Sequence, residues 1–268
     1  MKQIITDIEK LTQAAKPVKF IDDSGNINKT ECLEIINDIK EVLTANPNII
    51  ALCAPQIGID ARVICIKFND GIKTFVNPVV TKKLKYSIGA EVCASMPGKE
   101  ILITRPEEIL TVYYTDELKY EDNKLLGVAA RLFDQQYQLL DGVIPSELGL
   151  ISEPEVDGSV ADLTEEEFQQ VVEIYKQFIK SKVSTIEKDL EGNEELAKEF
   201  RSLKFTESVI TGHASIVTAD KETTDRYKKA QATAAMSLKV NEQNQKNAQR
   251  AQLNKYLNHK GKSKKKGK

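Results

Sequence analysis

RLFDQQYQLLDG, residues 131–142, combines helical spacing with a definite stop. Apolar side chains recur at steps of three and four residues, as they do along one face of an α-helix. These side chains are Leu132, Phe133, Tyr137, Leu139 and Leu140. Asp141-Gly142 is a pair that typically ends a helix. The stretch therefore predicts an amphipathic helix that packs one face into a core and carries two adjacent glutamines, Gln135 and Gln136.

Several extended segments precede this helix. Residues 61–68 and 75–80 are rich in β-branched and aromatic side chains, and residues 101–106 and 107–116 alternate between apolar and polar ones. A separate helix is predicted to start at Thr30 and to end at Asn46-Pro47. The order of strands and helices favours an α+β domain.

Four motifs follow one another along residues 1–150. They are LCAPQIG at residues 52–58, FVNPVV at 75–80, EVCASMPG at 91–98 and the helix at 131–142. In this order they resemble the motifs of peptide deformylases. The resemblance implies a peptide deformylase-like fold, in which antiparallel strands surround a central helix, followed here by a C-terminal helical extension.

The resemblance also assigns roles to positions. It places the family's two metal-binding histidines at Gln135 and Leu139, its catalytic glutamate at Gln136, its thiolate ligand at Cys93 and its active-site glutamine at Gln56. An amide nitrogen cannot ligate a metal, and a leucine side chain has no lone pair. We therefore expect no metal, no cofactor and no catalysis, so that the chain is predicted to be a pseudoenzyme.

Two other interpretations stay open. A divergent metal-dependent hydrolase that removes N-formyl groups from peptides would need Cys93, Gln56, Gln135 and Asp134 as ligands. Alternatively, the family's peptide cleft is kept for binding alone, although large side chains at Ile49, Val92 and Leu139 would partly fill it.

Two further positions bear on these alternatives. Gln56 has a purely structural interpretation, in which it satisfies buried backbone groups in a turn. Glu100 stands where many family members place a substrate-contacting arginine, which reverses the charge.

Beyond residue 150 the family pattern ends, and we divide the chain into residues 1–150, 151–220 and 221–268. Thr164 and Glu167 form a capping box for a long helix with an apolar stripe. Residues 221–258 lack Gly and Pro and predict a polar helical arm that ends in a Lys-rich tail. The candidate interaction residues are Phe168, Val172, Tyr175, Phe178, Ile179, Tyr227, Leu238, Lys264, Lys265 and Lys266.

Charge is divided unevenly along the chain. The formal net charge is −2, but residues 226–268 contain thirteen Lys or Arg against one acid, Glu242. That segment therefore carries +12 and residues 1–225 carry −14. Such a tail favours nonspecific contact with nucleic acid or with acidic protein surfaces.

The remaining composition narrows the class of protein. Four cysteines without a paired spacing indicate free, buried thiols, and no apolar run is long enough to span a membrane. The two histidines, His213 and His259, have no ligand partner nearby in sequence and are interpreted as surface or loop residues.

These features together predict a non-catalytic structural or interaction protein. We expect a subunit of a larger assembly, such as the tail, neck or baseplate of a phage virion. Its partners would be other protein subunits in a homo- or hetero-oligomer, located in the virion or in the host cytoplasm.

Overall fold

The computed structural model describes residues 1–20, 29–153, 159–188, 194–211 and 216–218. The polar arm predicted at residues 221–268, with Tyr227, Leu238 and the Lys264–Lys266 run, lies outside these residues, as do both histidines. No helix among the described residues is long and apolar enough to cross a membrane.

One antiparallel sheet forms the body of the protein, and its strand order follows the chain. The strands are β1 (Ala51–Cys53), β2 (Val63–Phe68), β3 (Gly71–Val92), β4 (Glu100–Tyr114) and β5 (Tyr120–Leu126). Two short strands are added at the edges: β6 (Leu150–Ser152) pairs with β4, and β7 (Ile216–Thr218) pairs with β3. All pairings are antiparallel, as the sequence predicts.

The sheet curls because its long strands are irregular. The β3–β4 register shifts between Val76 and Val79 and again between Val80 and Lys82. Asn77, at the first shift, has a φ of +49°, a conformation that Asn tolerates better than most residues. Its side chain donates to the carbonyl of Val18 at 2.9 Å and accepts from the amide of Val18 at 2.8 Å. These two hydrogen bonds attach the N-terminal segment to the sheet at the bulge.

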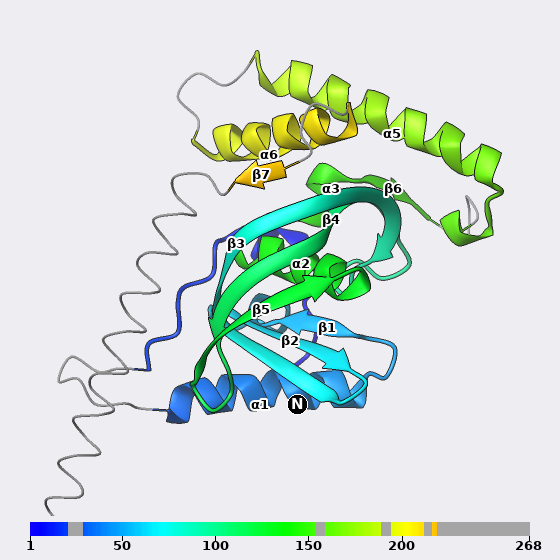
Figure 1. Cartoon of the computed structure of the whole chain (residues 1–268). Coiled ribbons are helices and arrows are strands. Elements are labelled where there is room, and N and C mark those ends of the chain that lie inside the picture. The colour runs from blue at the N-terminus through cyan, green and yellow to red at the C-terminus, as the bar shows by residue number, and fades with distance from the viewer. Residues whose placement is uncertain (21–28, 154–158, 189–193, 212–215, 219–268) are drawn as a thin grey trace, which may run out of the picture.

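Helix α2 (Val128–Leu140) lies within the curl, as Figure 1 shows. Its apolar face joins the larger of two buried clusters, together with side chains from β1 to β5 and from the C-terminal helices. Phe133 packs edge-on against Phe75 of β3. The predicted α+β fold, with antiparallel strands around a central helix, is confirmed.

The opposite side of the sheet is covered by α1 (Thr30–Ala45), whose buried face includes Ile36, Ile39 and Leu43. These side chains form the second cluster with residues from β1, β2 and the short helix η2 (Ala54–Ile57). The two clusters share one sheet between them, so the body has three layers.

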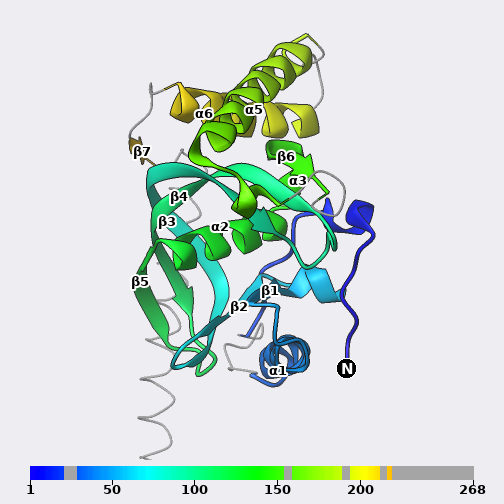
Figure 2. The same cartoon turned by 90° about the vertical axis from the view of Figure 1, so that its right-hand side faces the viewer.

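The C-terminal extension covers one end of this body (Figure 2). It follows α3 (Pro145–Leu148) and contains η3 (Val160–Asp162), α5 (Glu165–Ile186) and α6 (Glu194–Ile210). The predicted capping box is present, because the Thr164 hydroxyl accepts from the Glu167 amide at 3.3 Å. The N-terminal segment contains η1 (Ile8–Leu11).

Some predicted boundaries differ from the structure. The two strands predicted at residues 101–106 and 107–116 form one continuous strand, β4. Pro106 stands in register with Tyr86, and its missing amide removes one ladder donor without forcing the chain out of its extended path. Helix α6 runs as far as Ile210, and Leu203 and Ile210 both pack against the larger cluster.

Gly142, just after α2, offers a test of this packing. Its φ is +73°, and a Cβ there would lie 2.2 Å from the backbone oxygen of Thr12. Gly98 has a similar φ of +74° with nothing within 4 Å of its Cβ position. Gly98→Ala should therefore lose only the left-handed strain of about 1–2 kcal/mol. Gly142→Ala should lose roughly 1–3 kcal/mol more in unfolding free energy.

Urea denaturation of both variants measures the difference. Equal losses for the two glycines would contradict the close approach of α2 to the N-terminal segment.

Candidate functional site

A buried arginine lies between α2 and the sheet. Arg105 follows Ile101 and Ile103 on the same face of β4, and its side chain is 0% exposed. Its guanidinium binds both carboxylate oxygens of Glu91 on β3, at 2.9 and 2.7 Å. Such a two-point contact fixes the planar group in orientation as well as position.

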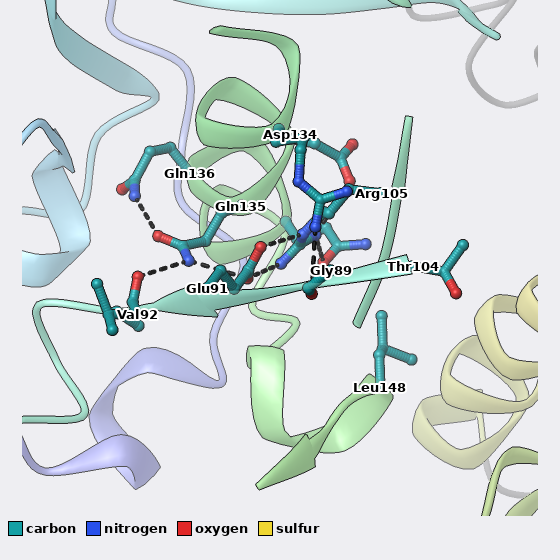
Figure 3. A network of polar contacts seen from close by, with 12 residues as sticks. Gly89, Glu91, Val92, Thr104, Arg105, Asp134, Gln135, Gln136 and Leu148 are labelled. Atoms are coloured by element: carbon teal, nitrogen blue, oxygen red, sulfur yellow. Dashed lines mark hydrogen bonds and ion pairs between the residues drawn. The ribbon is translucent and has the colours of Figure 1, made fainter. Parts of the chain in front are cut away.

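The same guanidinium also reaches α2. Nη1 of Arg105 donates to Asp134 at 3.0 Å and to Gln138 at 2.5 Å. The ammonium of Lys83 on β3 lies 2.5 Å from the other oxygen of Asp134. The network therefore joins both long strands to the central helix, as Figure 3 shows for Arg105, Asp134 and Glu91.

The protonation states of this network follow from burial and charge. Burial alone would lower the pKa of Arg105, but the carboxylates of Glu91 and Asp134 outweigh it and raise that pKa. Burial alone would raise the pKa of Asp134, yet Lys83 and Arg105 bring it below the usual value. Both shifts favour the charged forms of Arg105 and Asp134 at neutral pH, as a stable buried ion pair requires.

Gln135 continues the network towards the end of β3. Its amide nitrogen donates to Glu91 at 2.9 Å and to the carbonyl of Val92 at 3.0 Å. Its amide oxygen accepts from Gln136 at 2.9 Å. Every hydrogen-bonding atom of the Gln135 side chain is thus engaged with protein groups (Figure 3). The carbonyl oxygen of Gln136 is buried and has no hydrogen-bond partner among the described residues.

Gln56, in η2, is buried beside two thiols. Its oxygen accepts a hydrogen bond from the backbone amide of Cys53 at 3.1 Å and so satisfies a buried backbone group of the turn. Its nitrogen contacts the sulfur of Cys93 at 3.7 Å and the hydroxyl of Ser95 at 3.2 Å. Gln56 thus binds the backbone of the turn and also contacts Cys93, the thiol that the family resemblance assigns as a ligand.

The Cys93 thiol is not activated. Burial raises its pKa to about 11, so it is protonated at neutral pH and is a poor nucleophile. Burial likewise raises the pKa of Cys53. All four cysteines are buried and free, as the sequence predicts.

The metal that the fold family implies does not fit the side chains at these positions. Cys93 is one soft donor, the amide of Gln135 is engaged with protein partners, and Leu139 is a fully buried hydrocarbon in the larger cluster. Among the described residues, no three His, Cys, Asp or Glu side chains form a group that could hold a metal ion. The ligand set proposed for a divergent hydrolase is not brought together either, because Asp134 faces Arg105 and Lys83.

The remaining site positions are placed as follows. Val92 is 67% exposed and so does not fill a cleft, although Cys93, the next residue, is buried. Glu100 accepts hydrogen bonds from the Ser159 hydroxyl at 2.7 Å and the Val160 amide at 2.8 Å. Glu100, which stands where many family members place an arginine, therefore binds the C-terminal extension.

The candidate interaction side chains on α5 divide into two groups. Val172, Tyr175 and Ile179 are buried within this chain, so their side chains are already covered. Phe168 and Phe178 are partly buried against the same cluster. The apolar stripe packs on the body of the protein, which leaves Ile174, at 54% exposure, as the large apolar side chain of α5 facing outward among the described residues.

Comparison with known proteins identifies the family. Residues 1–148 match the family described as polypeptide deformylase, and because this match covers more than half of the sequence, the chain belongs to that family. Peptide deformylase of Thermoanaerobacter pseudethanolicus is 28% identical over 166 residues, which span 62% of this chain and 93% of that protein. Peptide deformylase of Symbiobacterium thermophilum is 30% identical over 139 residues, which span 51% and 60%.

A solved structure gives a similar picture. The crystal structure of peptide deformylase from Thermotoga maritima has 26% sequence identity and a TM-score of 0.49, and it covers 55% of this chain and 97% of that chain.

These comparisons correct one prediction. The interpretation of the chain as a pseudoenzyme is contradicted, because the family and the relatives that match are named for an enzyme activity. The sequence argument was too broad for a physical reason. The residues at Gln135, Gln136 and Leu139 argue only against a metal site built from these three positions. His213 and His259 lie outside the described residues.

The sequence analysis missed Arg105 as the centre of the site. A usable signal was present, because Arg105 continues the alternation of Ile101 and Ile103 and so occupies an inward-facing position of its strand. An ionised side chain at such a position requires buried partners of opposite charge.

Asp134→Asn tests the ion network. Removing one charge from a buried pair should cost about 3–5 kcal/mol of unfolding free energy at neutral pH. The pKa of Asp134 is lowered from 3.8, so its contribution is complete above about pH 4 and is lost as the pH falls through the lowered value. The stability gap between wild type and variant should therefore narrow in acid.

Urea titrations between pH 7 and pH 3 measure this gap. Asp7→Asn is the control, because Asp7 pairs with Lys10 at 2.9 Å on an exposed surface and should contribute less than about 1 kcal/mol. A gap that widens in acid would contradict the assignment.

Proposed function

We propose that this chain is a divergent hydrolase of the deformylase family that removes N-formyl groups from peptides. Family membership over residues 1–148 is the observation that carries the proposal. The side chains at the family's metal positions give this proposal no further support. The substrate class comes from the name that the relatives share, peptide deformylase.

In this proposal Gln56, which is fully buried, is the residue that would donate to the formyl oxygen. β3 ends at the exposed Val92, and the next residue, Cys93, is buried. The donor would be the side-chain nitrogen of Gln56. It lies 3.2 Å from the hydroxyl of Ser95 and 3.7 Å from the sulfur of Cys93. A neutral amide donor suits a formyl oxygen, which is a hydrogen-bond acceptor without formal charge.

Formate release from a formyl-methionyl peptide tests the proposal. The protein should release formate above a blank, as purified or after addition of Fe²⁺, Ni²⁺ or Zn²⁺. Gln56→Leu should lower kcat/KM by about 100-fold or more, since the loss of a single polarising donor has effects of that order.

Gln169→Leu is the matched control, because Gln169 lies on the exposed side of α5 and contacts only Glu165 among the described residues. No formate under any of the metal conditions would contradict the proposed activity.

A second candidate function is that of a subunit in a larger assembly, for example in a phage virion or in the host cytoplasm. The extension beyond residue 148 supports it, because a helical hairpin is added to the family's domain and presents Ile174 outward. The +12 charge of residues 226–268 supports contact with acidic protein surfaces or nucleic acid. This role is compatible with catalysis.

Light scattering coupled to size-exclusion chromatography tests the assembly function. We expect a mass of at least twice the 30.0 kDa of one chain. Ile174→Glu should shift the mass towards the monomer, because a charge at a buried apolar contact is strongly unfavourable. A monomer at all concentrations, alone and with candidate partner proteins, would contradict this function.

A further inference from the structure

The outer edge of β4 is completed by three different elements. β6 pairs with Glu100–Leu102, and β5 pairs with residues from Glu108 onward. Between these two stretches lies Thr104, whose backbone amide donates to the phenol oxygen of Tyr175 at 3.1 Å. The Thr104 hydroxyl lies 3.1 Å from the same oxygen, and that oxygen donates to the carbonyl of Leu148 at 3.2 Å.

Tyr175 comes from the middle of α5 and is fully buried. A buried backbone amide without an acceptor is costly, so the tyrosine takes the place of a strand residue at this point of the edge. The Tyr175 ring packs in the larger cluster, and its hydroxyl supplies the hydrogen bonds. The extension thus provides a part of the sheet that the family domain leaves open at Thr104.

The position of this contact relates it directly to the site. Thr104 precedes Arg105, which binds Glu91 and Asp134. On the other side of β4, Thr104 is in register with Ile88, and Glu100 is in register with Val92. The β3 segment that carries Glu91 and leads to Cys93 is therefore paired with the part of β4 that Tyr175 holds.

A second contact of the extension lies at the other end of the same β4 segment. Glu100 accepts from the Ser159 hydroxyl and from the Val160 amide, at 2.7 and 2.8 Å. The extension therefore holds β4 at two points, at Glu100, which is paired with β6, and at Thr104, which lies beyond the residues paired with β6. Both attachment residues are opposite the β3 segment between Ile88 and Val92.

We propose that Tyr175 is a positioning residue of the site. Through Thr104 it fixes the strand that carries Arg105. Through Arg105 it fixes Glu91 and Gln135, whose amide also binds the carbonyl of Val92, the residue before Cys93. The positioning role of Tyr175 rests on the proposed hydrolase function, but a chemical readout that needs no catalysis can test it.

Tyr175→Phe removes one oxygen and keeps the ring in the core. The amide of Thr104 and the carbonyl of Leu148 then lose their partner, so the β4 edge should open locally more often. The measurement is the rate at which iodoacetamide alkylates each cysteine of the full chain, followed by mass spectrometry. We expect an increase on the order of 10-fold at Cys93.

Cys32 and Cys65 serve as controls within the same molecule. Both are buried in the second cluster, on the α1 side of the sheet, and have no contact with the Arg105 network. Their alkylation rates should stay within about twofold of the wild-type values, because local opening at β4 leaves α1 in place. A parallel rise at Cys32, Cys65 and Cys93 would instead indicate global destabilisation and would overturn the proposal.

Two further variants complete the test. Gln177→Ala, on the exposed side of the same helix, should leave the rate at Cys93 unchanged. Glu100→Ala removes the second attachment and should raise the Cys93 rate selectively, also in the event that Tyr175→Phe does not fold. An unchanged Cys93 rate in a folded Tyr175→Phe would overturn the role of Tyr175. If that variant does not fold, an unchanged rate in Glu100→Ala would overturn the role of the extension. Formate release is measured separately, so its absence contradicts only the proposed activity.

Discussion

The ionic contact of Arg105 with Glu91 and Asp134 is the constraint on which the rest of the site depends. It lies where the two longest strands and the central helix meet, and its partners come from all three. Removing such charges from water has a large cost, which is offset only when every partner is close and correctly oriented. The network therefore specifies how α2 is placed against the sheet. Gln135 takes its orientation from the same Glu91 carboxylate.

Family membership and local chemistry give complementary information about this chain. The match over residues 1–148 establishes the family, and the relatives are named for an enzyme activity. The side chains around Cys93 form a hydrogen-bonded arrangement of amides, in which Gln56 and Gln135 have protein partners. A fold is specified by a whole pattern of buried positions, whereas a metal centre depends on three or four donor atoms. Substitutions at a few positions can therefore change the site while the family pattern persists.

Individual helices and strands could be predicted from the sequence because periodicity and turn residues act locally, whereas their arrangement was expected from the family resemblance. The helix around Phe133, the capping box at Thr164 and the strand at residues 75–80 were all predicted from spacing. The site was less predictable. Asp134 and Arg105 are 29 residues apart, and no local pattern indicates that they meet. The same holds for Glu100 and Tyr175, whose contacts with residues 159–160 and with Thr104 depend on how the extension docks on β4.

The order of strands in the sheet has a consequence for how the protein is made. Each of the strands β2 to β5 pairs with the strand that precedes it, so every one of these pairings closes a short loop. A growing chain can form this sheet from its N-terminal part while later residues are still being synthesised, at about 5–20 residues per second. The β4 edge at Thr104 remains open until α5 has emerged. The site thus reaches its final rigidity only when the last described helices have docked.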